Sequence, residues 1–118
     1  MKLRMQGNSL RLRLTRPEVE RLRESGAVVE TARFSGGSSL TYQIRKGTGV
    51  EVHAGLADGA LTIYVPTAQV DGWAASDEVG ISAQDGVMHI LIEKDFRCLT
   101  RPPEEEPDAY PNPEGSRC

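Results

Sequence analysis

The chain has few of the side chains on which catalysis and metal binding usually depend. Its 118 residues include two cysteines, Cys98 and Cys118, and two histidines, His53 and His89. Recognised zinc sites bring their ligands in close pairs such as Cys-x-x-Cys, whereas these four residues are isolated from one another along the sequence. They are weak candidates for a metal site. We therefore predict no bound metal or cofactor and expect both histidines on the surface.

The two cysteines are also too few to form a disulfide framework. A bond between Cys98 and Cys118 would close the end of the chain and contribute about 3 kcal/mol. The reducing cytoplasm in which we expect the protein opposes that bond. A nucleophilic Cys98 would need a neighbouring histidine, a helix start or a cationic pocket that favours the thiolate. Arg97 is the one cation beside it, so we expect free thiols and no enzymatic activity.

Long apolar runs are missing as well. No stretch approaches the roughly 18 apolar residues that a membrane-spanning helix needs. The first residues open directly into an alternating pattern instead of the hydrophobic region of a signal peptide. The hydrophobic content of 38% is enough for the modest core of one domain. These features predict a cytoplasmic protein without membrane contact.

Charge is distributed unevenly along the chain. Residues 1–46 hold ten Lys and Arg against four Glu, whereas residues 47–118 hold four Lys and Arg against thirteen acids. The first part is therefore strongly basic and the second strongly acidic, although the net charge is −3. Two such parts can attract one another within a chain, pair between chains, or present a charged face to a partner.

An internal repeat is the most informative pattern. Residues 10–30 can be laid on residues 61–81 at an offset of 51 without a gap, and residues 40–46 on residues 88–94 at an offset of 48. The identical pairs are Leu10 with Leu61, Val19 with Val70, Ser25 with Ser76, and Val28 with Val79. Upstream, Gly7-Asn8 falls opposite Asp58-Gly59, and both dipeptides suit a two-residue hairpin turn. The pattern predicts a duplicated β-β-α-β-β unit, present in residues 1–46 and 50–94.

Local signals define the elements of each unit. Apolar residues alternate in eight segments, which we expect to be strands at residues 2–6, 9–15, 27–34, 40–46, 50–55, 60–65, 79–84 and 87–94. Thr15 and Glu18 form a capping box for a short helix that Gly26 ends. In the second unit Pro66 takes the place of Thr15, so we expect Thr67 to cap a helix that starts one residue later, within residues 67–75.

These elements predict an α+β fold that is mainly antiparallel, a pseudo-twofold barrel or sandwich with two short helices. Residues 1–98 are expected to form a single β-rich domain. Residues 99–118 show no periodic pattern and hold five of the seven prolines together with five acids. We expect this segment to be an irregular acidic tail.

Four cations would project from one face of the first hairpin: Lys2, Arg4, Arg11 and Arg13. Such a patch can contact phosphates, but no aromatic side chains are interleaved with it for base stacking. The acidic pI of about 5.4 also disfavours nucleic acid. The alternatives are a face that binds the acidic tail, a face that binds an acidic partner, or a merely solvated face.

The chain resembles a family of small, uncharacterised bacterial proteins of similar length. The resemblance is carried by the opening KLRMQGNSLRLRLTRPEVERL, the central SDEVGI, and the closing LIEKDFRCL followed by YPNP. It covers nearly the whole chain, and GNSLRLRLT is its most specific part. It implies a bacterial cytoplasmic origin and no catalytic residue.

The preferred hypothesis is a small non-enzymatic module that works by binding, using the basic hairpin face and the acidic tail. Its partner would be a second copy of the chain or an acidic protein. The alternative is a metal or small-molecule site near Cys98 and Cys118.

Overall fold

Eight strands and two helices follow one another in an order that repeats halfway along the chain. The computed structural model describes residues 1–95. The first half contains β1 (Lys2–Gln6), β2 (Ser9–Leu14), α1 (Arg16–Ser25), β3 (Ala27–Arg33) and β4 (Ser39–Gly47). The second half contains β5 (His53–Ala57), β6 (Ala60–Pro66), α2 (Thr67–Ala74), β7 (Gly80–Asp85) and β8 (Met88–Lys94). The predicted α+β class is confirmed.

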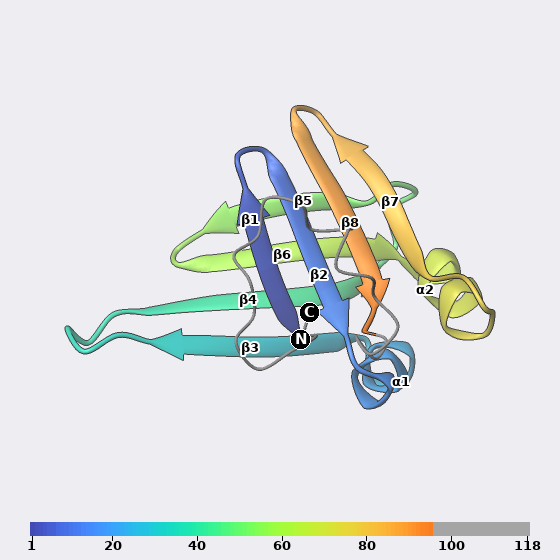
Figure 1. The fold of residues 1–118 in the computed structure, drawn as a ribbon, viewed down its shortest axis with the longest axis horizontal. Coiled ribbons are helices and arrows are strands. Elements are labelled where there is room, and N and C mark those ends of the chain that lie inside the picture. The colour runs from blue at the N-terminus through green and yellow to red at the C-terminus, as the bar shows by residue number, and fades with distance from the viewer. Residues whose placement is uncertain (96–118) are drawn as a thin grey trace, which may run out of the picture.

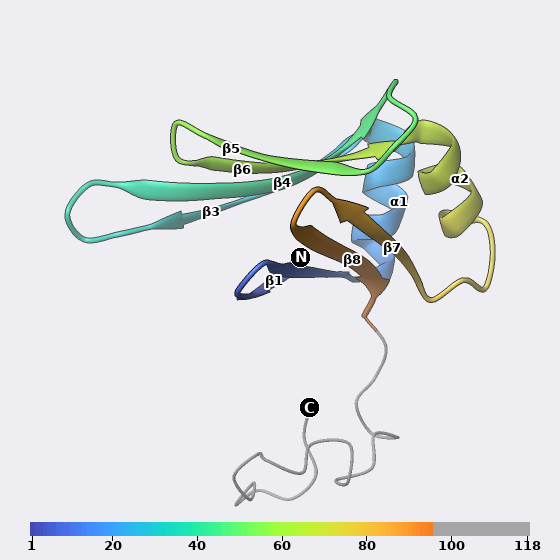
Figure 2. The same cartoon turned by 90° about the horizontal axis from the view of Figure 1, so that it is seen from above.

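The strands form two four-stranded sheets stacked on each other. The first sheet has the order β1-β2-β8-β7 and the second has the order β3-β4-β6-β5. All pairs are antiparallel except β2 with β8 and β4 with β6, which are parallel. The strands of one sheet cross those of the other at a steep angle (Figure 1), and α1 and α2 lie together at one end of the stack (Figure 2). The sandwich alternative is confirmed and the barrel alternative is wrong, because in the described residues each sheet keeps its own two edge strands.

Exchanging the two halves of the chain converts one sheet into the other. Strands β1, β2, β8 and β7 then take the places of β5, β6, β4 and β3. The register is kept too: Leu3 lies opposite Leu12 in the first sheet, and Ala54 lies opposite Ile63 in the second, at the predicted offset of 51. Each sheet thus contains one hairpin from each half, joined through its central parallel pair.

The gapless alignment fails after the second helix. Val28 pairs with Ile44 on β4, and the residue that makes the equivalent pair on β8 is Ile81 rather than Val79. Val28 and Ile81 are buried, whereas Val79 is 53% exposed. The second half therefore has two additional residues between α2 and β7. The indole N–H of Trp73 donates to the carbonyl of Val79 at 3.3 Å, which holds this longer loop against the helix.

The start of β5 also differs from its prediction. The Asp58-Gly59 turn, in which both residues have positive φ, pairs Ala57 with Ala60 and so fixes the strand directly upstream of it. Residues 50 and 51 lie before the strand in a bend, and Val50 is 91% exposed. Alternation alone placed this strand too early.

The two helices start differently. In α1 the carboxylate of Glu18 accepts hydrogen bonds from the backbone N–H of Thr15 at 2.8 Å and from its hydroxyl at 3.1 Å, and Gly26 ends the helix with a φ of 86°. In α2 the cap is Pro66, and the helix begins at Thr67. The prediction that Thr67 caps a later start is wrong. The Thr67 hydroxyl instead donates to the carbonyl of Gly47 at 3.2 Å.

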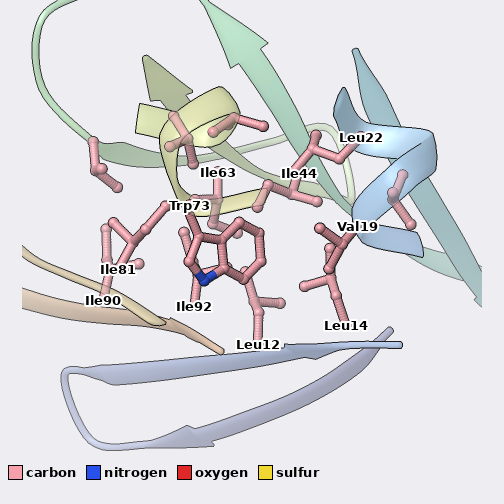
Figure 3. Close-up of a cluster of buried hydrophobic side chains, with 14 of the residues drawn as sticks. Leu12, Leu14, Val19, Leu22, Ile44, Ile63, Trp73, Ile81, Ile90 and Ile92 are labelled. Atoms are coloured by element: carbon pink, nitrogen blue, oxygen red, sulfur yellow. The ribbon is translucent and has the colours of Figure 1, made fainter. Parts of the chain in front are cut away.

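The core lies between the sheets and continues under the helices. Leu10, Leu12 and Leu14 alternate inward along β2 and are fully buried, and Ile90 and Ile92 do the same on β8. Figure 3 shows the Trp73 indole between side chains of the two sheets. The alternation that buries these leucines places the intervening arginines on the outer face of the first sheet.

Candidate binding face on the first sheet

The four predicted cations lie together on the outer face of the first sheet, which we call the basic face. It comprises the outward side chains of β1, β2 and the end of β8. Lys2 lies opposite Arg13, and Arg4 lies opposite Arg11 in the antiparallel pair of β1 and β2. The two cross-strand pairs form adjacent rows, because successive outward residues on a strand are two positions apart. The structure thus brings these four residues together.

Two acidic residues from the second half enter this face. Strand β8 runs parallel to β2 and sets Glu93 beside Arg13. Glu93 Oε1 lies 3.0 Å from Arg11 Nε and 3.5 Å from Arg13 Nε. Asp95 Oδ2 lies 3.3 Å from Lys2 Nζ. The basic first half and the acidic second half therefore attract one another within the chain.

Glu93 is largely enclosed between the two guanidinium groups. Its side chain is 18% exposed, and Oε1 is out of contact with solvent. Neither nitrogen makes a hydrogen bond to this atom within residues 1–95. The short distances identify an ion pair whose attraction is mainly Coulombic. It neutralises part of the positive charge of the basic face.

A positive excess remains after this pairing. The four cations face two carboxylates, and Arg4 has no ion-pair partner within residues 1–95. At the positions that correspond to the four cations, the second sheet carries His53, Gly55, Thr62 and Tyr64. The same fold is thus built without cations there, so packing does not require the charge of the basic face.

Sequence reasoning identified the four cations but not the contribution of Glu93 and Asp95 to their face. Alternation along β8 indicates that Glu93 points outward. It does not indicate that β8 pairs in parallel with β2, about eighty positions away in the sequence. That pairing is the signal that was missing.

The candidate metal ligands are placed on the surface or lie outside the described residues. His53 is on β5 and stacks on Tyr64 with ring centroids 4.9 Å apart, and its Nδ1 is 3.9 Å from Asp85 Oδ2. His89 is exposed on β8, in the other sheet. Both histidines thus occupy the predicted surface positions. Within residues 1–95 no group of three His, Cys, Asp or Glu residues is arranged to hold a metal, and Cys98 and Cys118 fall outside that range.

The fold and the basic face define a class: a small α+β sandwich that presents a cluster of four cations on the outer face of one sheet. The chain belongs to the family described as "Family of unknown function (DUF7009)", whose model matches residues 1–114. The expected membership of a family of unknown function is confirmed. The chain has no match among curated proteins or solved structures. Neither helix in residues 1–95 has the length and apolar character needed to cross a membrane.

Proposed function

We propose that this protein is a non-enzymatic binding module whose basic face holds an acidic polypeptide segment. The observation that carries the proposal is the cluster of four cations at positions whose equivalents on the second sheet are His53, Gly55, Thr62 and Tyr64. A charge that the fold does not need for packing is available for recognition. We further propose that the module works in the cytoplasm.

The composition of the face favours carboxylates over nucleic acid. Guanidinium groups pair with carboxylates through two parallel hydrogen bonds, a geometry that suits individual acidic side chains. Glu93 and Asp95 interrupt the cations and would repel a continuous run of phosphates. Single-stranded nucleic acid also needs aromatic platforms for its bases, and the outward residues of the next row are Gln6, Ser9 and His89.

A second copy of the chain supplies a segment of the required chemistry. Residues 99–118 contain five acids and two arginines. Binding of this segment from another molecule would produce a self-associating module, and binding of a similar segment from another protein would produce a heterologous complex. Both depend on the same face.

We infer that a duplication event produced the two similar halves of the chain. It would first have produced two like faces, of which one later acquired the four cations, whereas the equivalent positions of the other carry none. The equivalent strand registers of the two sheets support this history.

The proposal is tested by titrating a labelled peptide of residues 99–118 into the full chain, using a variant whose own Glu104, Glu105 and Glu106 are replaced by Gln to prevent competition. We expect binding that weakens as ionic strength rises, because exposed charges are screened over about 10 Å at 0.1 M salt. Arg4→Gln should weaken it by about fivefold, which corresponds to about 1 kcal/mol.

Arg45→Gln is the matched control, since Arg45 is exposed on the outer face of the second sheet and has no ion-pair partner in the described part of the chain. Equal losses from Arg4→Gln and Arg45→Gln would contradict the proposal. Salt-independent binding would contradict it as well. The mass of the wild-type chain in solution at low and high salt separates self-association from binding to another protein.

A further inference from the structure

A cleft opens at the end of the molecule where the helices lie, away from the centre of the basic face. Its volume is about 600 Å³, within the range of small-molecule sites. Its floor is apolar and is formed by Leu14, Val19 and Ala74. Its rim is charged, with Arg16 and Glu20 from α1, Asp77 from the loop after α2, Lys94 from the end of β8, and Asp95 directly after that strand.

The position of the cleft in the fold is informative. It lies at the carboxyl ends of the parallel strands β2 and β8, between the start of α1 and the end of α2. Crevices outside the carboxyl ends of parallel strands are the usual ligand sites of sheets flanked by helices. The pseudo-twofold relation supplies a second such place in the same molecule, at the ends of β4 and β6.

That second place is bridged by the protein itself. Lys46, which corresponds to Lys94, donates to the carbonyl of Arg23 at 2.8 Å and to Asp71 Oδ1 at 3.0 Å. It thereby ties the end of α1 to the side of α2. The strand pairings confirm the correspondence, since Lys46 pairs with Val65 and Lys94 pairs with Leu14.

The equivalent bridge is not made at the cleft. Lys94 donates to the carbonyl of Ser76 at 2.7 Å, in the loop that follows α2. Glu20, which corresponds to Asp71, instead accepts a hydrogen bond from Arg23 at 2.7 Å. Lys94 is therefore not tied to α1 within residues 1–95. The Lys46–Asp71 ion pair spans the space between the helices at the ends of β4 and β6, whereas the equivalent space in the cleft beside Lys94 is open to a ligand.

The free charges at the rim indicate what that group is. Arg16 and Asp77 make no ion pair or side-chain hydrogen bond within residues 1–95. Arg16 is at the amino end of α1, where the helix dipole favours an anion, and Asp77 follows the carboxyl end of α2, where the dipole favours a cation. An occupant that carries both a carboxylate and an ammonium group would pair with both side chains.

We propose that the cleft binds a small zwitterion with an apolar side chain, an amino acid or a dipeptide. Its carboxylate faces Arg16, its ammonium group faces Asp77, and its side chain lies on the apolar floor. The site shares Asp95 with the edge of the basic face but uses Arg16 and Asp77, which lie outside that face, so either proposal can fail without the other.

The test uses the full chain with leucine and leucyl-leucine as probes. Trp73 is the single tryptophan, and Lys94 Nζ lies 5.8 Å from the centre of its ring, so tryptophan emission reports occupancy and calorimetry gives the affinity. The comparison compounds are 3-methylbutylamine, which lacks the carboxylate, and 4-methylpentanoate, which lacks the amine. We expect each to bind at least about tenfold more weakly than leucine, because each leaves one charged group of the site unpaired.

Two exposed variants assign the ends of the ligand. Arg16→Gln should weaken the binding of leucine by about tenfold and leave the binding of 3-methylbutylamine, which has no carboxylate, unaffected. Asp77→Asn should also weaken the binding of leucine by about tenfold, but leave the binding of 4-methylpentanoate, which has no amine, unaffected. Arg21→Gln and Glu51→Gln change the same charges at exposed positions outside the cleft and should change nothing.

Three results would overturn the proposal. The first is no saturable response to either probe up to roughly 10 mM. The second is equal binding of leucine and 3-methylbutylamine. The third is a peptide of residues 96–118 that changes Trp73 emission while the zwitterions do not, which would identify the chain itself as the occupant.

Discussion

Replacing Glu93 by Gln should make the protein less stable and, at the same time, a tighter binder of acidic peptides. The residue sits between Arg11 and Arg13, so the substitution removes the negative charge that separates two guanidinium groups while keeping the shape of the side chain. Stability and binding are then affected in opposite directions by one change. That combination distinguishes a functional charge excess from a merely solvated face.

The size of the stability loss follows from the burial of the pair. Fully exposed ion pairs contribute about 0–1 kcal/mol, and breaking a fully buried pair costs about 3–5 kcal/mol. The side chains of Glu93 and Arg13 are each 18% exposed and that of Arg11 is 36% exposed, which is between those limits. We expect a loss of about 2 kcal/mol, or a fall in melting temperature of roughly 8–16 °C for a domain of this size.

The binding gain is smaller. The face changes from an excess of two positive charges to an excess of three, and one charge at about 4 Å in a solvated setting contributes about 1 kcal/mol, or about fivefold in affinity. Thermal unfolding and titration with the labelled acidic peptide measure the two effects. Glu51→Gln, at an exposed position outside the face, should alter neither. A Glu93→Gln protein that binds more weakly than wild type would refute the proposed role of the charge excess.

Five further substitutions test how the fold is held together. Burial opposes ionisation of Glu18, but hydrogen bonds from the amino terminus and the helix cap outweigh it and lower the pKa of its carboxyl. Glu18 therefore stabilises the folded state at pH values above the unfolded pKa of about 4.5, and this stabilisation is lost as the pH falls through the lower folded pKa. Urea unfolding between pH 6 and pH 3 should show this loss, and Glu18→Gln should abolish it. Gly80→Ala should cost about 1–3 kcal/mol, since the added Cβ would lie 2.7 Å from a backbone oxygen of β8. Gly72→Ala, in open space on α2, should instead stabilise by about 0.5–1 kcal/mol in the same unfolding assay. Ile81→Ala should cost about 2–5 kcal/mol of stability and Val79→Ala less than about 0.5 kcal/mol, because Ile81 is buried and Val79 is exposed. A larger loss from Val79→Ala than from Ile81→Ala would instead identify Val79 as the equivalent of Val28, as in the gapless alignment.

The order of elements could be predicted from the sequence because their signals are local. The alternating leucines of β2, the capping pair Thr15 and Glu18, and the glycine turns each act over a few residues. The repeat holds further information that the prediction of residues 50–55 did not use: adding the offset of 51 to Lys2–Gln6 gives His53–Ala57, which are the bounds of β5. Alternation alone had placed this strand about three residues too early. Consistency between the halves was thus a better guide than either half by itself.

The arrangement of the sheets could not be predicted in the same way. Whether two hairpins from one half pair with each other or with those of the other half depends on the parallel contacts of β2 with β8 and of β4 with β6. These contacts join segments far apart in sequence, and no turn signal specifies them. The ion pairs of Glu93 and the cleft beside Lys94 both follow from this pairing, so neither was visible in the sequence.

The two halves of the chain differ most at outward-facing positions, which the packing of the core does not constrain. Buried positions stay apolar in both, as Leu10 and Leu61 or Leu12 and Ile63 illustrate, because the shared interior fixes their size and polarity. The outer positions of the same strands carry Arg11 in one half and Thr62 in the other. Of the equivalent lysines, Lys46 ties α1 to α2, whereas Lys94 donates to the loop after α2 and is not tied to α1 within residues 1–95. Because the two halves share the same order of elements and the same strand registers, the second half serves as a control that shows what folding alone requires. The basic face and the open cleft both depart from that requirement, and these departures are where binding should be sought.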